Sequence, residues 1–189
     1  MNPSPRKLEI ISVASTLFKE KGYSAVTMRD IAKAMGIKAA SLYNHIKNKE
    51  EILTFIIISL AEEFIEGLDM VKDSNANCEE KLKQIISLHV DITSRNTNGM
   101  ASLNNDWMHL KDRLDDYLVV RVEYENTFRD IIKEGIKNNE IKNLNPDIML
   151  FSILSTLRSL YIWIPQKEEM EPALLAFNLS EVLLKGINK

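Results

Sequence analysis

Apolar residues recur every three or four positions through most of this 189-residue chain, and that period predicts helices. No stretch keeps the strict alternation of a half-buried strand, so no strand is predicted. We expect about nine helices, at Pro5–Lys21, Thr27–Met35, Ala39–His45, Lys49–Val71, Asn77–Thr93, Met100–Met108, Lys111–Ile136, Pro146–Ile164 and Pro172–Gly186. The pattern therefore predicts an all-α protein.

The breaks between these segments carry recognisable helix signals. Gly22 and Gly36 stand where helices end, and Thr27-x-x-Asp30 has the form of a capping box. Asn145 followed by Pro146 is a helix start, with an N-cap residue before proline at the first helical position. Signals of this kind place a helix end to within a few residues.

The first part of the chain has the layout of a helix-turn-helix. Two short helices, at Thr27–Met35 and Ala39–His45, are separated only by the turn at Met35-Gly36-Ile37. In this motif the second helix enters the major groove of DNA. We expect a three-helix DNA-binding domain at residues 1–50 and a second, helical domain at residues 51–189.

The distribution of charge agrees with this division. The net charge is −3, but residues 1–50 hold nine Lys/Arg against four Asp/Glu, and the remaining residues hold 15 against 23. A basic N-terminal part on an acidic body is the pattern of a protein that contacts phosphate at one end only.

Composition narrows the class further. The chain is 45% hydrophobic and 27% charged, as in ordinary globular domains, and its single cysteine excludes an internal disulfide. No signal-peptide core and no uninterrupted apolar run of about 18 residues is apparent, so we expect a cytoplasmic protein without a membrane segment. A redox role for Cys78, which stands at a helix start, is a minor alternative.

The last two helices are apolar on more of their circumference than one core requires. A stripe of roughly 100° is enough for a single core, so the wider stripe indicates a second buried face. We expect a homodimer, which suits a palindromic DNA site, with a fully buried central helix as the alternative. The residues expected at the dimer interface are Ile153, Leu157, Leu160, Tyr161, Leu175, Leu179, Val182 and Leu183.

The block from Ala14 to Leu53 resembles the DNA-binding domain of the TetR family of bacterial transcriptional repressors. The matching elements are Ala14-x-x-Leu17-Phe18, Gly22-Tyr23, Thr27-x-Arg29-Asp30-Ile31-Ala32, Gly36-Ile37, Ser41-Leu42-Tyr43, His45 and Lys49-Glu50-Glu51-Ile52-Leu53. The match spans roughly 40 residues, is continuous and keeps the family's spacing. It implies a repressor that a small-molecule effector, bound in the C-terminal domain, releases from DNA.

The resemblance and the chemistry of the side chains assign candidate DNA contacts. Phosphate contacts are expected from Thr27, at a helix N-terminus, and from Arg29, Tyr43, His45 and Lys49. Arg29 has a base edge as its alternative, and Tyr43 and His45 have alternatives as a packing residue and an exposed helix-end residue. The residues expected to read bases are Lys38, Ala39, Ala40, Ser41 and Asn44.

Two positions depart from the family pattern. Lys38 stands where a small capping residue such as serine is usual, so the recognition helix is expected to start less firmly or one residue away. Ile46 replaces the aromatic residue that usually follows His45, a core exchange that should cost little. The first departure bears directly on which side chains reach the bases.

An effector site in the helical domain is expected to combine apolar walls with a few polar anchors. The candidates are His89, Trp107, Tyr117, Arg121, Tyr124, Phe128 and Trp163, each with plain core packing as its alternative. No cofactor is expected, and the spacing of the histidines does not support a metal site.

An enzyme is the competing functional class, but no nucleophile motif, metal spacing or glycine-rich phosphate loop is present. A third class is a degenerate member of the family that acts as a protein-binding module. The intact basic segment at residues 1–50 argues against it.

Overall fold

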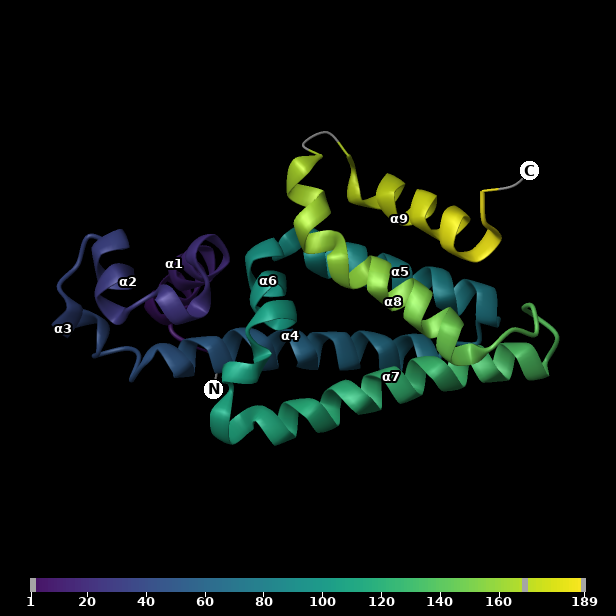
Figure 1. The fold of residues 1–189 in the computed structure, drawn as a ribbon, viewed down its shortest axis with the longest axis horizontal. Coiled ribbons are helices and arrows are strands. Elements are labelled where there is room, and N and C mark those ends of the chain that lie inside the picture. The colour runs from purple at the N-terminus through teal and green to yellow at the C-terminus, as the bar shows by residue number, and fades with distance from the viewer. Residues whose placement is uncertain (1–2, 168–169, 188–189) are drawn as a thin grey trace. The chain divides into compact units, whose positions relative to one another are not determined.

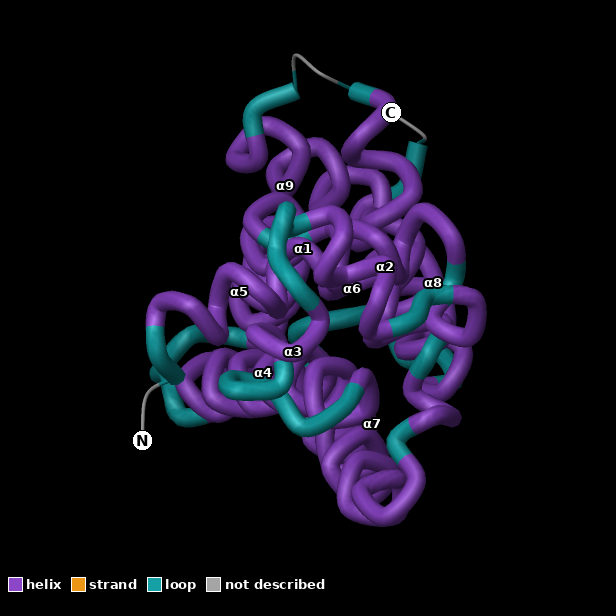
Figure 2. Tube along the Cα trace, turned by 90° about the vertical axis from the view of Figure 1, so that its left-hand side faces the viewer, coloured by secondary structure: helices purple, strands orange, loops and turns teal. Residues whose placement is uncertain are grey.

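The computed structural model describes residues 3–167 and 170–187, and these residues form nine α-helices and no strand (Figure 1, Figure 2). The helices are α1 (Pro5–Lys21), α2 (Met28–Ala34), α3 (Ala39–Leu42), α4 (Lys49–Lys72), α5 (Cys78–Arg95), α6 (Thr97–Asn105), α7 (Leu114–Lys137), α8 (Pro146–Trp163) and α9 (Pro172–Ser180). The prediction of an all-α chain is confirmed.

The predicted start and stop signals lie at the ends of helices in the structure. Gly22 ends α1 in a left-handed conformation, with φ of +80°. Thr27 and Asp30 form a reciprocal capping box at the start of α2. The side chains of Asn77 and Asn145 accept hydrogen bonds from backbone N–H groups in the first turns of α5 and α8. Local chemistry therefore fixes four of the helix ends.

The region between α6 and α7 differs from the prediction. The helix expected at Met100–Met108 is α6, which begins and ends three residues earlier, and two 3₁₀ turns follow at Trp107–His109 and Lys111–Arg113. Lys111 has a φ of +45°, a left-handed conformation that an α-helix cannot contain, so α7 begins only at Leu114.

The chain divides into two compact units that differ from the predicted domains. The first comprises residues up to Leu60 together with Asn98–Tyr117, and the second comprises Ala61–Thr97 with the residues from Leu118 onward. Helix α4 runs unbroken through the predicted boundary after residue 50. The segment 98–117 is tied to the first unit by the hydrogen bond from Asn98 Nδ2 to Thr16 Oγ1, of 3.0 Å.

The core of the first unit is formed by α1 to α3 and the first half of α4. Its deeply buried side chains include Ile10, Ala14, Phe18, Ile31, Leu42, Ile46, Ile52, Leu53 and Ile57, and Met100 and Leu110 of the segment 98–117 are buried to the same degree. Ile46, which replaces the family's usual aromatic residue, is 1% exposed and so serves as a core residue. This core fixes the short helices α2 and α3, which are too short to be stable alone.

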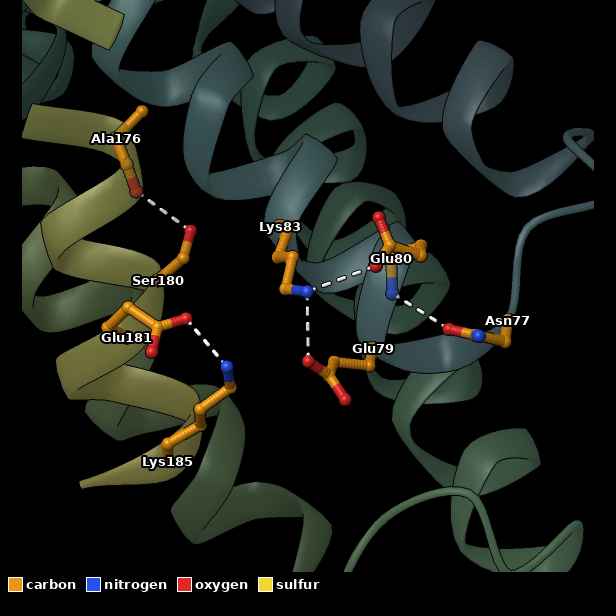
Figure 3. Close-up of polar contacts among 8 residues, drawn as sticks. All are labelled: Asn77, Glu79, Glu80, Lys83, Ala176, Ser180, Glu181 and Lys185. Carbon is orange, nitrogen blue, oxygen red and sulfur yellow. Dashed lines mark hydrogen bonds and ion pairs between the residues drawn. The ribbon is translucent and has the colours of Figure 1, made fainter. Parts of the chain in front are cut away.

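In the second unit, α8 and α9 both pack against α5 (Figure 1). The start of α5 and the turn that follows α9 carry exposed ion pairs (Figure 3): Lys83 Nζ lies 2.9 Å from Glu79 and 3.0 Å from Glu80, and Lys185 lies 2.8 Å from Glu181. Exposed pairs of this kind contribute little stability. The stability of this layer therefore rests on its apolar contacts.

Helix α8 is the most apolar of the long helices. Among the described residues, Pro146–Gln166 is long and apolar enough to cross a membrane by length and composition alone, and 33% of its most apolar 18-residue window is buried within the chain. A single segment of this kind is weak evidence of a membrane span, because a core helix passes the same test. Much of the apolar surface of α8 is left uncovered by the chain itself, which agrees with the second buried face expected from the sequence.

Candidate nucleic-acid interface and ligand core

The start of α2 is held by Thr27 and Asp30. The Thr27 hydroxyl donates to Asp30 Oδ2 at 2.6 Å and accepts from the Asp30 N–H at 3.2 Å, and the Thr27 N–H donates to the same carboxylate at 2.9 Å. The Thr27 hydrogen bonds hold the pKa of Asp30 below its ordinary value. Because the hydroxyl of Thr27 is engaged, a phosphate here would be bound by the unpaired N–H groups of the first helical turn.

The recognition helix α3 presents a row of polar side chains to solvent. Leu42 and Ile46 are buried beneath it. The predicted contact residues lie on the outside: Lys38, Ala40, Ser41, Tyr43, Asn44 and His45 are exposed and Ala39 is half-buried. Arg29, in the first turn of α2, is also exposed. This is the arrangement that direct reading of base edges requires.

Lys38 occupies the N-cap position of α3. Its backbone is extended, with φ of −72° and ψ of 142°, and its side chain makes no capping hydrogen bond. A serine here would satisfy one of the exposed N–H groups of the first turn. The helix therefore starts at Ala39 without a side-chain cap, and the long side chain of Lys38 projects from the surface instead.

Lys49, predicted to clamp a phosphate, is turned toward its own chain. Its Nζ donates to the carbonyl oxygens of Tyr23 at 2.7 Å, Val26 at 2.8 Å and Ser24 at 3.4 Å. An ammonium group has three protons to donate. All three have protein acceptors in this structure, and the phosphate contact of Lys49 stays a prediction.

The polar centre of the second unit is a buried histidine and tyrosine. His89 on α5 and Tyr124 on α7 are hydrogen-bonded, with 2.8 Å between Nε2 and the hydroxyl. The ring of Phe64 on α4 covers both, at 4.6 Å from the imidazole centroid and 6.1 Å from the phenol centroid. The other imidazole nitrogen, Nδ1, has no hydrogen-bond partner within residues 3–167 and 170–187.

Burial controls the protonation of this pair. Desolvation, with a smaller contribution from the charge of Arg158, lowers the pKa of His89 to about 3. Desolvation also raises the pKa of Tyr124 well above its ordinary value. Both side chains are therefore neutral at physiological pH, and the pair can exchange hydrogen bonds with a ligand without carrying charge.

Two arginines share one carboxylate beside this pair. Arg158 on α8 contacts Glu125 on α7 at 2.5 Å, and Arg121 lies 3.6 Å from the same carboxylate. Hydrogen bonds to Arg158 help to lower the pKa of Glu125 against the opposing effect of burial. The cluster is close enough to His89 for the charge of Arg158 to affect the pKa of the imidazole.

The predicted effector residues do not all come together. His89 and Tyr124 form the pair, Phe128 is fully buried in the same unit, and Arg121 belongs to the arginine cluster. Trp107 and Tyr117 belong to the first unit, where their ring centroids are 6.2 Å apart. Trp163 is 37% exposed at the end of α8, beneath the ammonium group of Lys167.

The predicted dimer residues are divided between two faces. Ile153, Leu157, Leu160 and Leu175 are 0–5% exposed within their own unit, so their assignment to a surface contact is corrected. They line the stripe of α8 and α9 that packs on α5. Val182 is exposed, and Tyr161, Leu179 and Leu183 are half-buried. The outer apolar face, which the prediction mostly missed, consists of Ile148, Phe151, Ile162, Leu174, Phe177 and Val182.

Several residues of these sites could not be found from local patterns. Phe64 and Glu125 read as ordinary members of amphipathic helices, and only the packing of α4 and α7 brings them to His89 and Arg158.

Comparison with known proteins agrees with this architecture. The family described as "Bacterial regulatory proteins, tetR family" matches residues 10–54, and "Tetracyclin repressor-like, C-terminal domain" matches residues 75–187. The chain is 26% identical to the Fatty acid metabolism regulator protein of Bacillus subtilis (strain 168), over 97% of this chain and 96% of that protein.

Two solved structures extend the comparison. The ketosteroid transcriptional regulator KstR2 of Mycobacterium tuberculosis shares the fold, with a TM-score of 0.91, 21% identity and coverage of 100% of this chain and 97% of that one. The transcriptional regulator FadR from Bacillus subtilis, in complex with stearoyl-CoA, has a TM-score of 0.70 and 26% identity, covering 96% and 99%. The two family matches together span most of the described helices, and this chain belongs to the TetR family of bacterial transcriptional regulators.

Proposed function

We propose that this chain is a homodimeric repressor that binds a palindromic operator and is released by an acyl-coenzyme A effector. The observation that carries the proposal is the exposed row of side chains on and after α3, above buried Leu42 and Ile46. Such a row on a rigid support is what sequence reading in the major groove needs. One α3 reads half a site, so a second copy must supply the other half.

The outer face of α8 and α9 is the proposed dimer interface. Phe151 is 71% exposed and Phe177 is 62% exposed, in a region that also includes Ile148 and Ile162. Three serines, Ser152, Ser155 and Ser159, lie between the apolar residues of α8. The hydroxyl groups of Ser152 and Ser159 donate to carbonyl oxygens of their own helix. All three side chains are small enough for another helix to approach closely. Large exposed apolar faces of this kind usually mark protein contacts.

The effector class is argued from the polar centre of the second unit. An acyl-coenzyme A combines a long apolar chain with anionic phosphates. The buried surroundings of His89 and Tyr124 suit the apolar part, and the guanidinium groups of Arg121 and Arg158 suit an anionic part. The relative crystallised with stearoyl-CoA supports the same class.

An electrophoretic mobility shift with DNA upstream of the protein's own gene tests the proposal. We expect a shift at low salt that a palindromic competitor abolishes and that stearoyl-CoA reverses. Coenzyme A alone and stearate alone are the matched controls, and each should reverse it less well than the thioester. Absence of binding to any palindromic DNA would refute the repressor; binding that no acyl-coenzyme A relieves would refute the effector class.

A further inference from the structure

The turn between α1 and α2 is held by side chains from distant parts of the first unit. After Gly22 the chain makes a 3₁₀ turn at Tyr23–Ala25 and reaches Thr27, the N-cap of α2, two residues later. Two backbone hydrogen bonds hold the turn, from the Ala25 N–H to Gly22 and from the Val26 N–H to Tyr23, each of 3.3 Å, and the carbonyl groups of Ser24 and Val26 need partners from elsewhere. Its conformation decides where α2 begins.

Lys49, in the first turn of α4, supplies those partners. Its ammonium group bonds the carbonyl oxygens of Tyr23 and Val26 at 2.7 and 2.8 Å, with a longer bond to Ser24, and lies 4.2 Å from the centroid of the Tyr23 ring. Burial lowers the pKa of Lys49, and the charge of Asp106 opposes that shift. The side chain thus joins the turn to α4 at three points and adds a cation–π contact.

The same turn is held from its other side by the segment after α6. Burial raises the pKa of the Tyr23 phenol, and the charges of Glu50 and Asp106 raise it further, while burial also raises the pKa of the Asp106 carboxyl. The imidazole of His109 stacks on the Tyr23 ring, with centroids 5.0 Å apart and planes inclined by 29°, and its Nε2 lies 3.5 Å from Ser24 Oγ. Tyr23 therefore lies between Lys49 and His109.

We propose that Lys49 is a positioning residue for DNA recognition and makes no phosphate contact. It fixes the turn at Tyr23–Val26, and through it the start of α2, which fixes the orientation of α3. The assignment rests on the operator binding proposed above. Its basis is that every donor of the ammonium group already has a carbonyl acceptor, at distances typical of charge-assisted bonds for two of the three.

The three possible roles of Lys49 give different binding patterns. A positioning residue affects operator DNA, whose bases must meet α3 in register, much more than non-specific DNA. A phosphate-binding residue, when removed, weakens both kinds of DNA and lowers the slope of log K against log salt by about 0.9 for each phosphate it neutralised. A purely structural residue weakens both kinds of DNA equally, because less of the protein is folded, and leaves their ratio unchanged.

The experiment compares Lys49→Met with Lys47→Met, which removes a nearby exposed lysine and so matches the change of charge. Affinities for operator and for scrambled DNA are measured by fluorescence anisotropy over a series of salt concentrations. For Lys49→Met we expect operator affinity to fall by about tenfold to a hundredfold, the cost of roughly one mismatched base pair. Scrambled-DNA affinity and salt slope should match those of Lys47→Met.

A salt slope lower than that of Lys47→Met, or an unchanged ratio of operator to scrambled affinity, overturns the proposal. If Lys49→Met does not fold, as judged by circular dichroism, Lys49→Gln replaces it, because its amide still donates to carbonyl oxygens but carries no charge. For Lys49→Gln the same slope and ratio decide the matter. Failure of the wild-type protein to bind any operator refutes the proposed function instead, independently of either variant.

Discussion

His89 Nε2 lies 2.8 Å from the hydroxyl of Tyr124, and both side chains are buried between α4, α5 and α7. A buried pair of this kind costs free energy if either partner is removed, because the remaining polar atom cannot reach water. It also ties α5 to α7 in the part of the molecule where the effector is proposed to bind.

Replacing Tyr124 with Phe should destabilise the protein by about 1–3 kcal/mol, since His89 then has no partner in a dry site. Urea denaturation followed by circular dichroism measures the change. Tyr43→Phe, which removes a hydroxyl from a side chain that is 53% exposed, is the control and should leave the unfolding free energy nearly unchanged. Equal effects of the two substitutions would contradict the importance of the buried pair.

The lowered pKa of His89 makes stability depend on pH. In the folded protein the pKa is about 3, against an ordinary value of 6.5, so on acidification the unfolded chain binds a proton first. The stability that this group contributes is therefore complete above pH 6.5 and declines as pH falls from 6.5 toward 3. Between pH 7 and pH 5 the unfolding free energy should fall by about 2 kcal/mol from this group. In His89→Gln that fall should disappear, whereas in His45→Gln it should persist.

Cys78 should react slowly with thiol reagents in the native protein. Burial, with help from the charge of Glu140, raises the pKa of its thiol from 9.0 to about 11, so the reactive thiolate is about a hundredfold scarcer. Labelling with Ellman's reagent at pH 8, with and without urea, measures this. A native rate close to the rate in urea would show that the site opens readily and would revive redox sensing.

Glutamate at Phe151 should separate the proposed dimer. Two charges would be buried per interface, and truncation or charging of a central aromatic typically costs about 2 kcal/mol or more. Sedimentation equilibrium should show weaker association, with operator binding reduced accordingly. Met70→Glu, on α4, changes a side chain of similar exposure, 76% against 71%, outside the proposed interface. If Met70→Glu dissociates the dimer and Phe151→Glu does not, the interface lies elsewhere.

Two substitutions near the recognition helix should have different consequences. Asn44→Ala should change which operator sequences are preferred, because the amide of Asn44 is exposed and is proposed to pair with a base edge. Tyr43→Ala should weaken binding to all sequences by a similar factor and leave the salt slope unchanged, because a neutral hydroxyl group that donates to a phosphate displaces no counterion. Selection from a random DNA library, together with salt titrations, separates the effects; the reverse pattern would exchange the two roles.

Much of the fold and of the DNA-binding site could be predicted because their signals are local. The glycine after α1, the Thr27 capping box and the Asn145 cap each act within one helical turn. The predicted contact residues between Lys38 and His45 lie on and around α3, where only Leu42 and then Ile46 are buried, although α3 ends at Leu42 and not at His45 as predicted. Spacing along a helix is enough to separate these two sets of residues.

Other predictions were limited by what periodicity can distinguish. An apolar stripe wider than one core indicated a second contact on α8 and α9, but not which side of each helix meets it. Ile153 and Leu157 were assigned to the surface and lie in the core, whereas Phe151 is exposed. The hydrophobic pattern is the same whichever side of the helix faces the core, and only the packing of α8 and α9 on α5 determines that side.

The sequence by itself determined that this is an all-α member of the TetR family with a basic N-terminal DNA-binding domain. Helix periods, caps and motif spacing each depend only on residues within a short stretch of the chain. Only the tertiary structure decided that Lys49 faces the Tyr23–Val26 turn, and that His89 meets Tyr124 across 35 residues of sequence. Such contacts depend on how separate helices pack, and the free energy of packing is summed over the whole core.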